Sequence, residues 1–469
     1  MLERISATNY RSFQHFDISL APITLFVGPN NSGKSSALSI IRLLSQTLES
    51  NDPNVRLLLN GAKGDFGTYK DLIHGGITRK HLEIKFSLRI DDRHMRLIPT
   101  DELITYDLHY KYRSSLKEII LKKLECFANN EPLLIAEFNE DSERFQLRRV
   151  GRSEISPTLR SELTLRALEV RNFLPRAGFA NFQEKGNELS KLIAEKVRRA
   201  SRNSVYAVRS LQSIEYVGAM RIPPSRTYLF SGERRLKVGA NGEHAITMLA
   251  MDSMRRGRKS RGIRQNVVNW LQIAGIASDI KIVHLSDRYF EVHIQHPITK
   301  EYANFADVGY GNSQVIPVLV AGLNAEGGDT FIVEEPEIHL HPKAQAELGD
   351  FFLDQFKRGV QSVIETHSEH MIVRLQRHIA QGNLQPKDVR IYYVHPTSSG
   401  KELIPLELNA QGIFTAEWPG GFFPERLAEA KELAIARANQ NGFEPERPDA
   451  FGKHKEKIKQ SDVTRGSEK

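Results

Sequence analysis

The chain has 469 residues, a formal net charge of +8 and a single cysteine. This length predicts two or three domains, and 40% hydrophobic residues suffice for a sizeable core. No apolar run reaches the roughly 18–20 residues of a membrane span, and the N-terminus lacks a signal-peptide core. One cysteine excludes an internal disulfide framework. We therefore expect a cytoplasmic protein with no membrane partner, whose charge is compatible with a polyanion such as DNA.

The first elements surround a Gly-rich loop. Residues 23–27 are short, apolar and rich in β-formers, and residues 36–44 have apolar side chains at helical spacing. Between them, residues 28–35 read Gly-Pro-Asn-Asn-Ser-Gly-Lys-Ser, which is a complete G-x-x-x-x-G-K-S phosphate-binding loop. The period-two alternation over 81–90 then predicts the first strand of a strand-rich lobe.

The loop indicates the class of ligand. Its backbone N–H groups and the following helix N-terminus would hold phosphate oxygens. Lys34 would reach the β- and γ-phosphates, and the Ser35 hydroxyl would bind Mg²⁺. The residues expected to contact the nucleotide are Gly28, Pro29, Asn30, Asn31, Ser32, Gly33, Lys34, Ser35 and Ser36.

The middle of the chain is more charged and predominantly helical in pattern. It contains six cations without an intervening acid, namely Arg255, Arg256, Arg258, Lys259, Arg261 and Arg264. Two interpretations stay open for this cluster: a solvated loop or linker, and a contact with a nucleic-acid backbone. Residues 281–296 alternate again and predict a hairpin.

The C-terminal third supplies the remaining chemistry. The predicted strand Thr330–Val333 runs into two acids, Glu334 and Glu335. In a P-loop fold the first would hold the Mg²⁺ shell, and the second would act as general base on the attacking water. A second predicted strand, Ser362–Glu365, precedes His367, which would bond the γ-phosphate.

A second Gly-rich turn, residues 307–315, precedes an apolar helix and forms another anion site. Because one nucleotide needs one phosphate cradle, this turn is expected to complete a site on another subunit.

Taken together, the motifs resemble the ABC-type ATPase heads of the RecF, SMC and OLD group. They resemble more closely the AAA-15/AAA-21-like bacterial ATPases with a C-terminal domain of unknown function. Besides the P-loop, the resemblance rests on Asn-Tyr-Arg-Ser-Phe at 9–13, GYGNSQV at 309–315, FIVEEPEIHLHP at 331–342 and ETHS at 365–368. EWPGGFFPER at 417–426 resembles a motif of that C-terminal segment, although a packing plug of Trp and Phe is the alternative.

The resemblance implies an α/β ABC-type P-loop NTPase head with a strand-rich N-terminal lobe and a mainly helical insertion. It also implies ATP and Mg²⁺ as cofactors, Glu335 and His367 as catalytic residues, and Ser35 and Glu334 at the metal. The residues that would contact the partner's γ-phosphate are Gly311, Asn312, Ser313 and Gln314, and the D-loop residues are Glu337, His339 and His341. Two departures from transporter ATPases are the absence of L-S-G-G-Q and a Glu at the metal position. Residues 65–68 are the candidate Q-loop.

The same resemblance divides the chain. Residues 1–158 would be the N-terminal part of the head, 159–280 the insertion, and 281–395 the rest of the head. Residues 396–438 would be the C-terminal segment of unknown function. Residues 439–469 are polar and are expected to be a disordered tail.

The predicted function is an ATPase whose heads form a homodimer or higher oligomer around ATP and reopen on hydrolysis. It would act as a DNA-associated switch or as the regulator of a separate nuclease or toxin, in anti-phage defence. Alternatives are a RecF-type DNA-repair ATPase, an OLD-like nuclease component, a transporter subunit and a non-hydrolysing ATP-gated scaffold. No D-x-D pair follows His367, so intrinsic nuclease activity is not expected.

Overall fold

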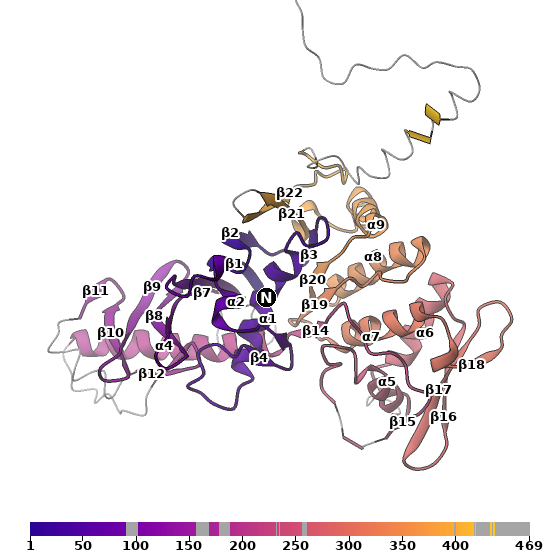
Figure 1. Ribbon diagram of the computed structural model, residues 1–469, viewed down its shortest axis with the longest axis horizontal. Coiled ribbons are helices and arrows are strands. Elements are labelled where there is room, and N and C mark those ends of the chain that lie inside the picture. The colour runs from indigo at the N-terminus through magenta and orange to yellow at the C-terminus, as the bar shows by residue number, and fades with distance from the viewer. Residues whose placement is uncertain are drawn as a thin grey trace, which may run out of the picture. The chain divides into compact units, whose positions relative to one another are not determined.

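The computed structural model in Figure 1 divides by its internal contacts into two compact units, Met1–Glu417 and Trp418–Lys469. All elements named below belong to the first unit. The residues that the structure describes are 1–90, 102–155, 168–177, 188–230, 232–233, 235–255, 260–397, 400–416, 418, 432–433 and 435–436.

The first unit is a mixed α/β structure, as the sequence predicts. Its principal helices are α1 (Lys34–Leu48), α2 (Tyr69–Leu72), α4 (Glu188–Gln212), α5 (Ala245–Ser253), α6 (Ile263–Ala274), α7 (Tyr310–Asn324), α8 (Pro342–Lys357) and α9 (Glu369–Ala380). Its strands are β1 (Leu2–Tyr10), β2 (Phe13–Ser19), β3 (Ile23–Val27), β4 (Asn60–Gly61), β5 (Gly64–Asp65), β6 (Leu82–Ile90), β7 (Glu102–Arg113), β8 (Glu118–Ala128), β9 (Glu131–Asn139), β10 (Arg144–Val150), β11 (Ser153–Glu154), β12 (Leu168–Arg171), β13 (Leu174–Ala177), β14 (Glu215–Val217), β15 (Tyr228–Leu229), β16 (Asp279–His284), β17 (Tyr289–Gln295), β18 (Tyr302–Asn304), β19 (Thr330–Glu334), β20 (Gln361–Glu365), β21 (Val389–Thr397) and β22 (Gly400–Leu406).

An antiparallel sheet forms the strand-rich lobe. Its eight strands lie in the order β11-β10-β9-β8-β7-β6-β1-β2, which confirms the predicted strand-rich region. Phe86, Tyr106 and Tyr110 are fully buried on its covered face, where α4 also packs. Cys126 is buried in this core, and burial raises the pKa of its thiol, as expected of a structural cysteine.

A second sheet positions the phosphate-binding loop. Its order is β14-β19-β20-β3-β21-β22, and every neighbouring pair is parallel except β21 with β22. Strands β3, β19 and β20 are buried at every residue, which explains their continuous apolar runs. Because parallel strands end at the same edge, the residues that follow β3, β19 and β20 meet there (Figure 1).

The Gln361 side chain joins the two sheets. Its Nε2 donates to the backbone carbonyls of Leu2 at 2.8 Å and Ala21 at 3.2 Å, and its Oε1 accepts from the Leu2 N–H at 3.1 Å. All these groups are buried, so the bonds replace those that water would otherwise provide. The first strand of the lobe is thereby held against the P-loop sheet.

The predicted strands at 330–333 and 362–365 are confirmed as β19 and β20, and the predicted hairpin as β16 and β17. The range 159–280 holds helices α4, α5 and α6, but its described part also contains β12 to β15. Of these, β14 pairs with β19 and so belongs to the P-loop sheet. Within the described residues, none of the helices is long and apolar enough to cross a membrane. The predicted tail, 439–469, lies outside the described residues, as does the motif at 417–426 apart from Trp418.

Candidate nucleotide-binding site

The P-loop connects β3 to α1 and requires glycine at two positions. Gly28 has φ 143° and Gly33 has φ 102°, values that side chains with a Cβ rarely adopt. A Cβ at Gly28 would also lie 2.8 Å from the carbonyl oxygen of Val394 on β21. Helix α1 begins at Lys34 and has no acidic residue in its first turn. Its positive end is therefore available to an anion.

Lys34 lies over this loop. Its ammonium donates to the carbonyl oxygens of Gly28 at 3.1 Å and Pro29 at 3.0 Å, and the residue is only 4% exposed. Burial lowers its pKa, whereas the nearby carboxylates of Glu365 and Glu335 raise it. A cation is thus held where a phosphate on the helix N-terminus would be within its reach.

The Ser35 hydroxyl, predicted as a metal ligand, bonds one of two neighbouring carboxylates. Its Oγ donates to Oε1 of Glu365 at 2.9 Å. Glu334 is paired with Glu365 in the parallel register of β19 and β20. Oε1 of Glu334 and Oε2 of Glu365 are buried without a hydrogen-bond partner, although an Arg42 nitrogen lies 3.3 Å from the former. Burial, followed by the charge of Glu334, raises the pKa of Glu365 to about 7.

These oxygens fit Mg²⁺, a hard cation that prefers carboxylate, hydroxyl, phosphate and water ligands. No group of three or more His, Cys, Asp or Glu side chains within the described part of the chain is arranged to hold a metal. Mg²⁺ at this site would therefore need phosphate oxygens of the nucleotide in addition to the predicted ligands Ser35 and Glu334.

The predicted general base, Glu335, directly follows β19. Its φ of 45° lies in the left-handed region, a strained conformation for a residue with a side chain. The carboxylate is 31% exposed, and its Oε1 lies 3.9 Å from Nε2 of His367. Burial and then the charge of Lys34 lower the pKa of His367, so its imidazole is neutral near pH 7. A carboxylate open to solvent and a neutral imidazole therefore lie side by side near the P-loop.

Arg221 holds the end of β19, a role that the sequence patterns did not reveal. Its guanidinium donates to the carbonyl oxygens of Glu334 at 2.6 Å and Glu335 at 3.3 Å. Burial lowers the pKa of Arg221 to about 10, whereas the charges of Glu337, Glu335 and Glu334 act to raise it. No catalytic motif surrounds this arginine in the loop after β14, so only the tertiary structure identifies it.

The predicted D-loop has one buried and two exposed members. Glu337 is 7% exposed, and its Oε1 accepts from the backbone N–H of His367 at 2.5 Å. It therefore joins two loops of its own chain and does not extend outwards. His339 and His341 are exposed, and His341 accepts from the Lys343 N–H as N-cap of α8.

The predicted contact loop for a partner's nucleotide begins α7. The helix starts at Tyr310, so Ser313 and Gln314 turn inwards and are buried. The Ser313 hydroxyl donates to the Tyr310 carbonyl at 2.8 Å within its own helix. In this conformation neither Ser313 nor Gln314 is presented to a second molecule. Gly311 and Asn312 are partly exposed, and Tyr310 is 68% exposed.

A family model described as "AAA domain, putative AbiEii toxin, Type IV TA system" (AAA_21) matches residues 23–372. The chain belongs to this family. The match contains the P-loop, β19, β20 and His367, and it confirms the resemblance to AAA-21-like ATPases. The class of the site is therefore that of a P-loop ATPase domain. A comparison with curated protein sequences found no match.

Solved structures also align with the AAA domain. They include an SmcHead bound to the C-winged helix domain of ScpA, with 11% identity and a TM-score of 0.41, covering 87% of this chain and 98% of that chain. An Smc head with an extended coiled coil, bound to the C-terminal domain of ScpA and derived from Pyrococcus furiosus, has 11% identity and a TM-score of 0.42, covering 92% and 99%. An SMC head from Thermotoga maritima has 10% identity and a TM-score of 0.39, covering 87% and 99%.

Two arginines of the basic cluster form hydrogen bonds and ion pairs within this AAA domain. Arg261 donates to the Asn324 carbonyl at 2.8 Å and is paired with Glu326. Arg264 donates to the Ile280 carbonyl at 2.7 Å and to Asp279 at 3.2 Å. Both side chains therefore stabilise the α6 region. Arg255 is half-buried, and Arg256, Arg258 and Lys259 lie outside the described residues.

Lys401 on β22 contacts the P-loop, which the sequence patterns did not predict. Its ammonium donates to the carbonyl oxygen of Asn31 in the loop.

The candidate Q-loop forms a local turn, in which Asp65 accepts from the Gly67 N–H at 2.7 Å and Thr68 caps α2. Its role as a Q-loop stays a prediction.

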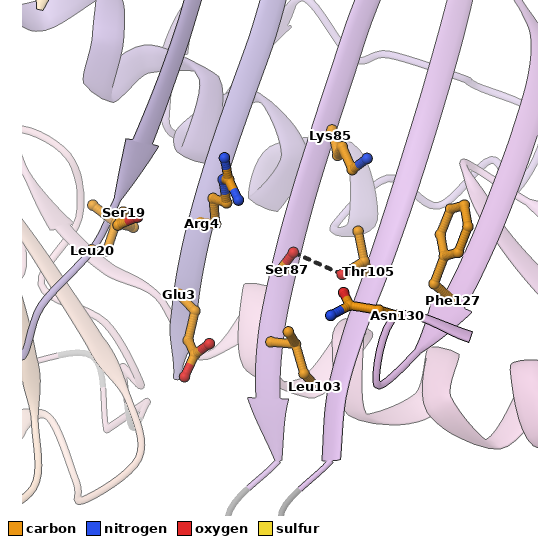
Figure 2. Close-up of a pocket in the computed structure, with 10 residues that line it drawn as sticks. All are labelled: Glu3, Arg4, Ser19, Leu20, Lys85, Ser87, Leu103, Thr105, Phe127 and Asn130. Atoms are coloured by element: carbon orange, nitrogen blue, oxygen red, sulfur yellow. Dashed lines mark hydrogen bonds between the residues drawn. The ribbon is translucent and has the colours of Figure 1, made fainter. Parts of the chain in front are cut away.

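Figure 2 shows a cavity of about 530 Å³ over β2, β1, β6, β7 and β8 of the antiparallel sheet. None of the predicted site residues lines it. Its charged residues already have partners, since Arg4 is paired with Asp17 and Lys85 with Asp107. Ser87 and Thr105 bond each other at 2.8 Å. We therefore assign no ligand to this cavity.

Proposed function

We propose that the chain binds ATP with Mg²⁺ at Lys34 and Ser35 and hydrolyses it with Glu335 as general base. The observation that carries the proposal is the convergence of three strand ends on one P-loop. Glu334 and His367 bring polar atoms there that are buried and have no hydrogen-bond partner. Buried polar atoms without a partner are costly, and a bound nucleotide and cation would satisfy them.

In this proposal the backbone N–H groups of the loop and Lys34 hold the β- and γ-phosphates. Ser35 and Glu334 hold Mg²⁺, which would neutralise charge that develops on the phosphate oxygens. Glu335 accepts a proton from the attacking water, and Arg221 fixes the backbone that carries this carboxylate. The neutral imidazole of His367 donates to the γ-phosphate.

We further propose that two copies pair through ATP and that the paired state controls a separate effector, a nuclease or a toxin. The family description contains the words "putative AbiEii toxin, Type IV TA system", and the biological role that we propose is anti-phage defence. Contact with DNA would involve the part of the basic cluster not used in the fold, beginning at Arg255. Cellular localisation would be cytoplasmic.

Phosphate release from ATP tests the chemistry. Glu335→Gln is expected to lower kcat by about 100-fold or more, because the general base is lost, while nucleotide still binds. Lys34→Ala is expected to weaken nucleotide binding itself. Glu301→Gln, at an exposed acid in the turn directly before β18, is the matched control and should keep the wild-type rate. Turnover by Glu335→Gln at the wild-type rate would show that the base lies elsewhere.

A further inference from the structure

Glu365 lies at the end of the strand between β3 and β19, but it is not among the residues predicted to bind the metal. It ends β20, the strand between β3 and β19, and is paired with Phe26 on one side and Glu334 on the other. Its side chain therefore lies between the P-loop and the acid predicted to hold Mg²⁺. The hydrogen bond from Ser35 Oγ to its Oε1, at 2.9 Å, confirms this proximity.

The two buried carboxylates, Glu334 and Glu365, have too few positive charges beside them. Glu334 is 8% exposed and Glu365 is 4% exposed, and each has one carboxylate oxygen without a hydrogen-bond partner. An Arg42 nitrogen lies 3.3 Å from Oε1 of Glu334, whereas no ion pair within the described residues joins a cation to Glu365. Two neighbouring buried carboxylates repel each other unless a cation or a proton compensates them.

We propose that Glu365 is a second carboxylate of the Mg²⁺ site, together with Ser35 and Glu334. This inference rests on the proposed ATPase function and deepens it. The unpartnered oxygens and the serine hydroxyl form an oxygen set of the type that Mg²⁺ prefers, and the nucleotide phosphates would complete it. The site then has one acid more than the sequence motifs assign.

The test measures binding of a fluorescent ATP analogue during a Mg²⁺ titration. Glu365→Gln keeps an acceptor for the Ser35 hydroxyl and nearly the same volume, but it removes the charge. The Mg²⁺ concentration for half-maximal binding is expected to rise by about 10-fold or more, the scale seen when metal-site partners are removed. In EDTA the variant should bind the analogue at least as well as wild type, because negative charge near the phosphates has been removed.

A thermal measurement without nucleotide or Mg²⁺ supplies an independent readout. Because Glu334 and Glu365 repel each other, Glu365→Gln is expected to unfold at a higher temperature than wild type. Glu301→Gln should match wild type in both measurements. Glu365→Asp, which keeps the charge on a shorter side chain, should need an intermediate Mg²⁺ concentration and provides a second variant should the first fail to fold.

The two proposals fail in different ways. If wild type binds the analogue in a Mg²⁺-dependent manner and Glu365→Gln has the same Mg²⁺ requirement, Glu365 is not part of the metal site and only this inference is overturned. If wild type binds no nucleotide with Mg²⁺, the proposed function falls and this inference falls with it.

Discussion

At the residue scale, the site concentrates carboxylates around two buried cations. Lys34 is 4% exposed and Arg221 is 7% exposed, and both lie near the acids that end β19 and β20. Removing one member of a buried charged network leaves the other charges uncompensated. The resulting loss of folding stability is larger than the net stability that the intact pair contributes. Arg221 is the one of the two that positions the proposed general base, because its guanidinium bonds the backbone carbonyls of Glu334 and Glu335.

We predict that Arg221→Gln lowers both the stability of the protein and ATP turnover. Loss of the buried guanidinium is expected to reduce the free energy of unfolding by about 3 kcal/mol. Arg221→Lys should restore part of the stability but less of kcat, because a lysine cannot bond both carbonyls with a planar fork. Urea unfolding and steady-state ATP hydrolysis measure the two effects.

The control is Arg226→Gln, since Arg226 is exposed and pairs with Asp307 at 2.6 Å. Exposed ion pairs contribute about 0–1 kcal/mol, so this variant should behave as wild type. If Arg221→Lys recovers kcat completely, the charge matters and the positioning of Glu335 by the guanidinium does not.

The residues of the P-loop could be predicted because its chemistry depends on contiguous sequence. Lys34 and Ser35 follow a strand and begin a helix, and both features are readable locally. Arg221 could not be predicted, because its carbonyl partners are over 110 residues away in sequence. Glu365 is the first residue of the ETHS motif, but only the pairing of β20 with β19 places it beside Glu334.

At the element scale, continuous apolar runs predicted β19 and β20 correctly, whereas the three-residue strand β14 was not predicted. Strands β19 and β20 are five residues each and wholly buried, whereas β14 has three residues and follows the 25-residue helix α4. A strand so short has no measurable period, so the sequence pattern assigns its residues to a mainly helical insertion. The structure shows that β14 extends the P-loop sheet next to β19.

Glu215 on β14 predicts a pH effect on stability. Burial raises the pKa of its carboxyl to about 7, and its Oε1 accepts from the Val238 N–H at 2.7 Å. The native state therefore keeps this proton up to about pH 7, whereas the unfolded chain loses it near the ordinary value of 4.5. Because the native state binds more protons in that window, this group's stabilising contribution falls as pH rises from about 5 to above 7.

Glu215→Gln is expected to remove this dependence while keeping the acceptor for Val238. Unfolding in urea at pH 5 should give similar stabilities for wild type and variant. At pH 8 the variant should be more stable, by up to about 3 kcal/mol if the full pKa difference is realised. Because all other titrating groups, including Glu365, are the same in both proteins, the difference in stability between variant and wild type reports the effect of Glu215 alone. An equal pH slope in the two proteins would contradict the raised pKa.

At the scale of the whole molecule, the exposed end of α7 is the surface on which the proposed dimer depends. The sequence predicted Ser313 and Gln314 as contacts to a partner's nucleotide, but the helix turns both inwards. Tyr310 and His339 remain exposed, with ring centroids 6.0 Å apart. The sequence motifs assign these two segments separately; the structure places Tyr310 beside His339, and the position at which α7 starts, which selects the exposed side chains, depends on packing.

We predict that Glu335→Gln forms a dimer with Mg²⁺ and ATP, because slow hydrolysis would keep the ATP-bound state populated. Light scattering after size exclusion should give twice the monomer mass of 53.2 kDa in ATP and the monomer mass in ADP. Adding Tyr310→Glu should prevent the dimer by placing a charge where the partner's phosphates would lie, without loss of ATP binding by the monomer. Tyr289→Glu, at a tyrosine 44% exposed on β17, is the matched control. A dimer that persists with Tyr310→Glu would show that the copies pair through another surface, and a monomer in ATP would show that the ATPase acts without pairing.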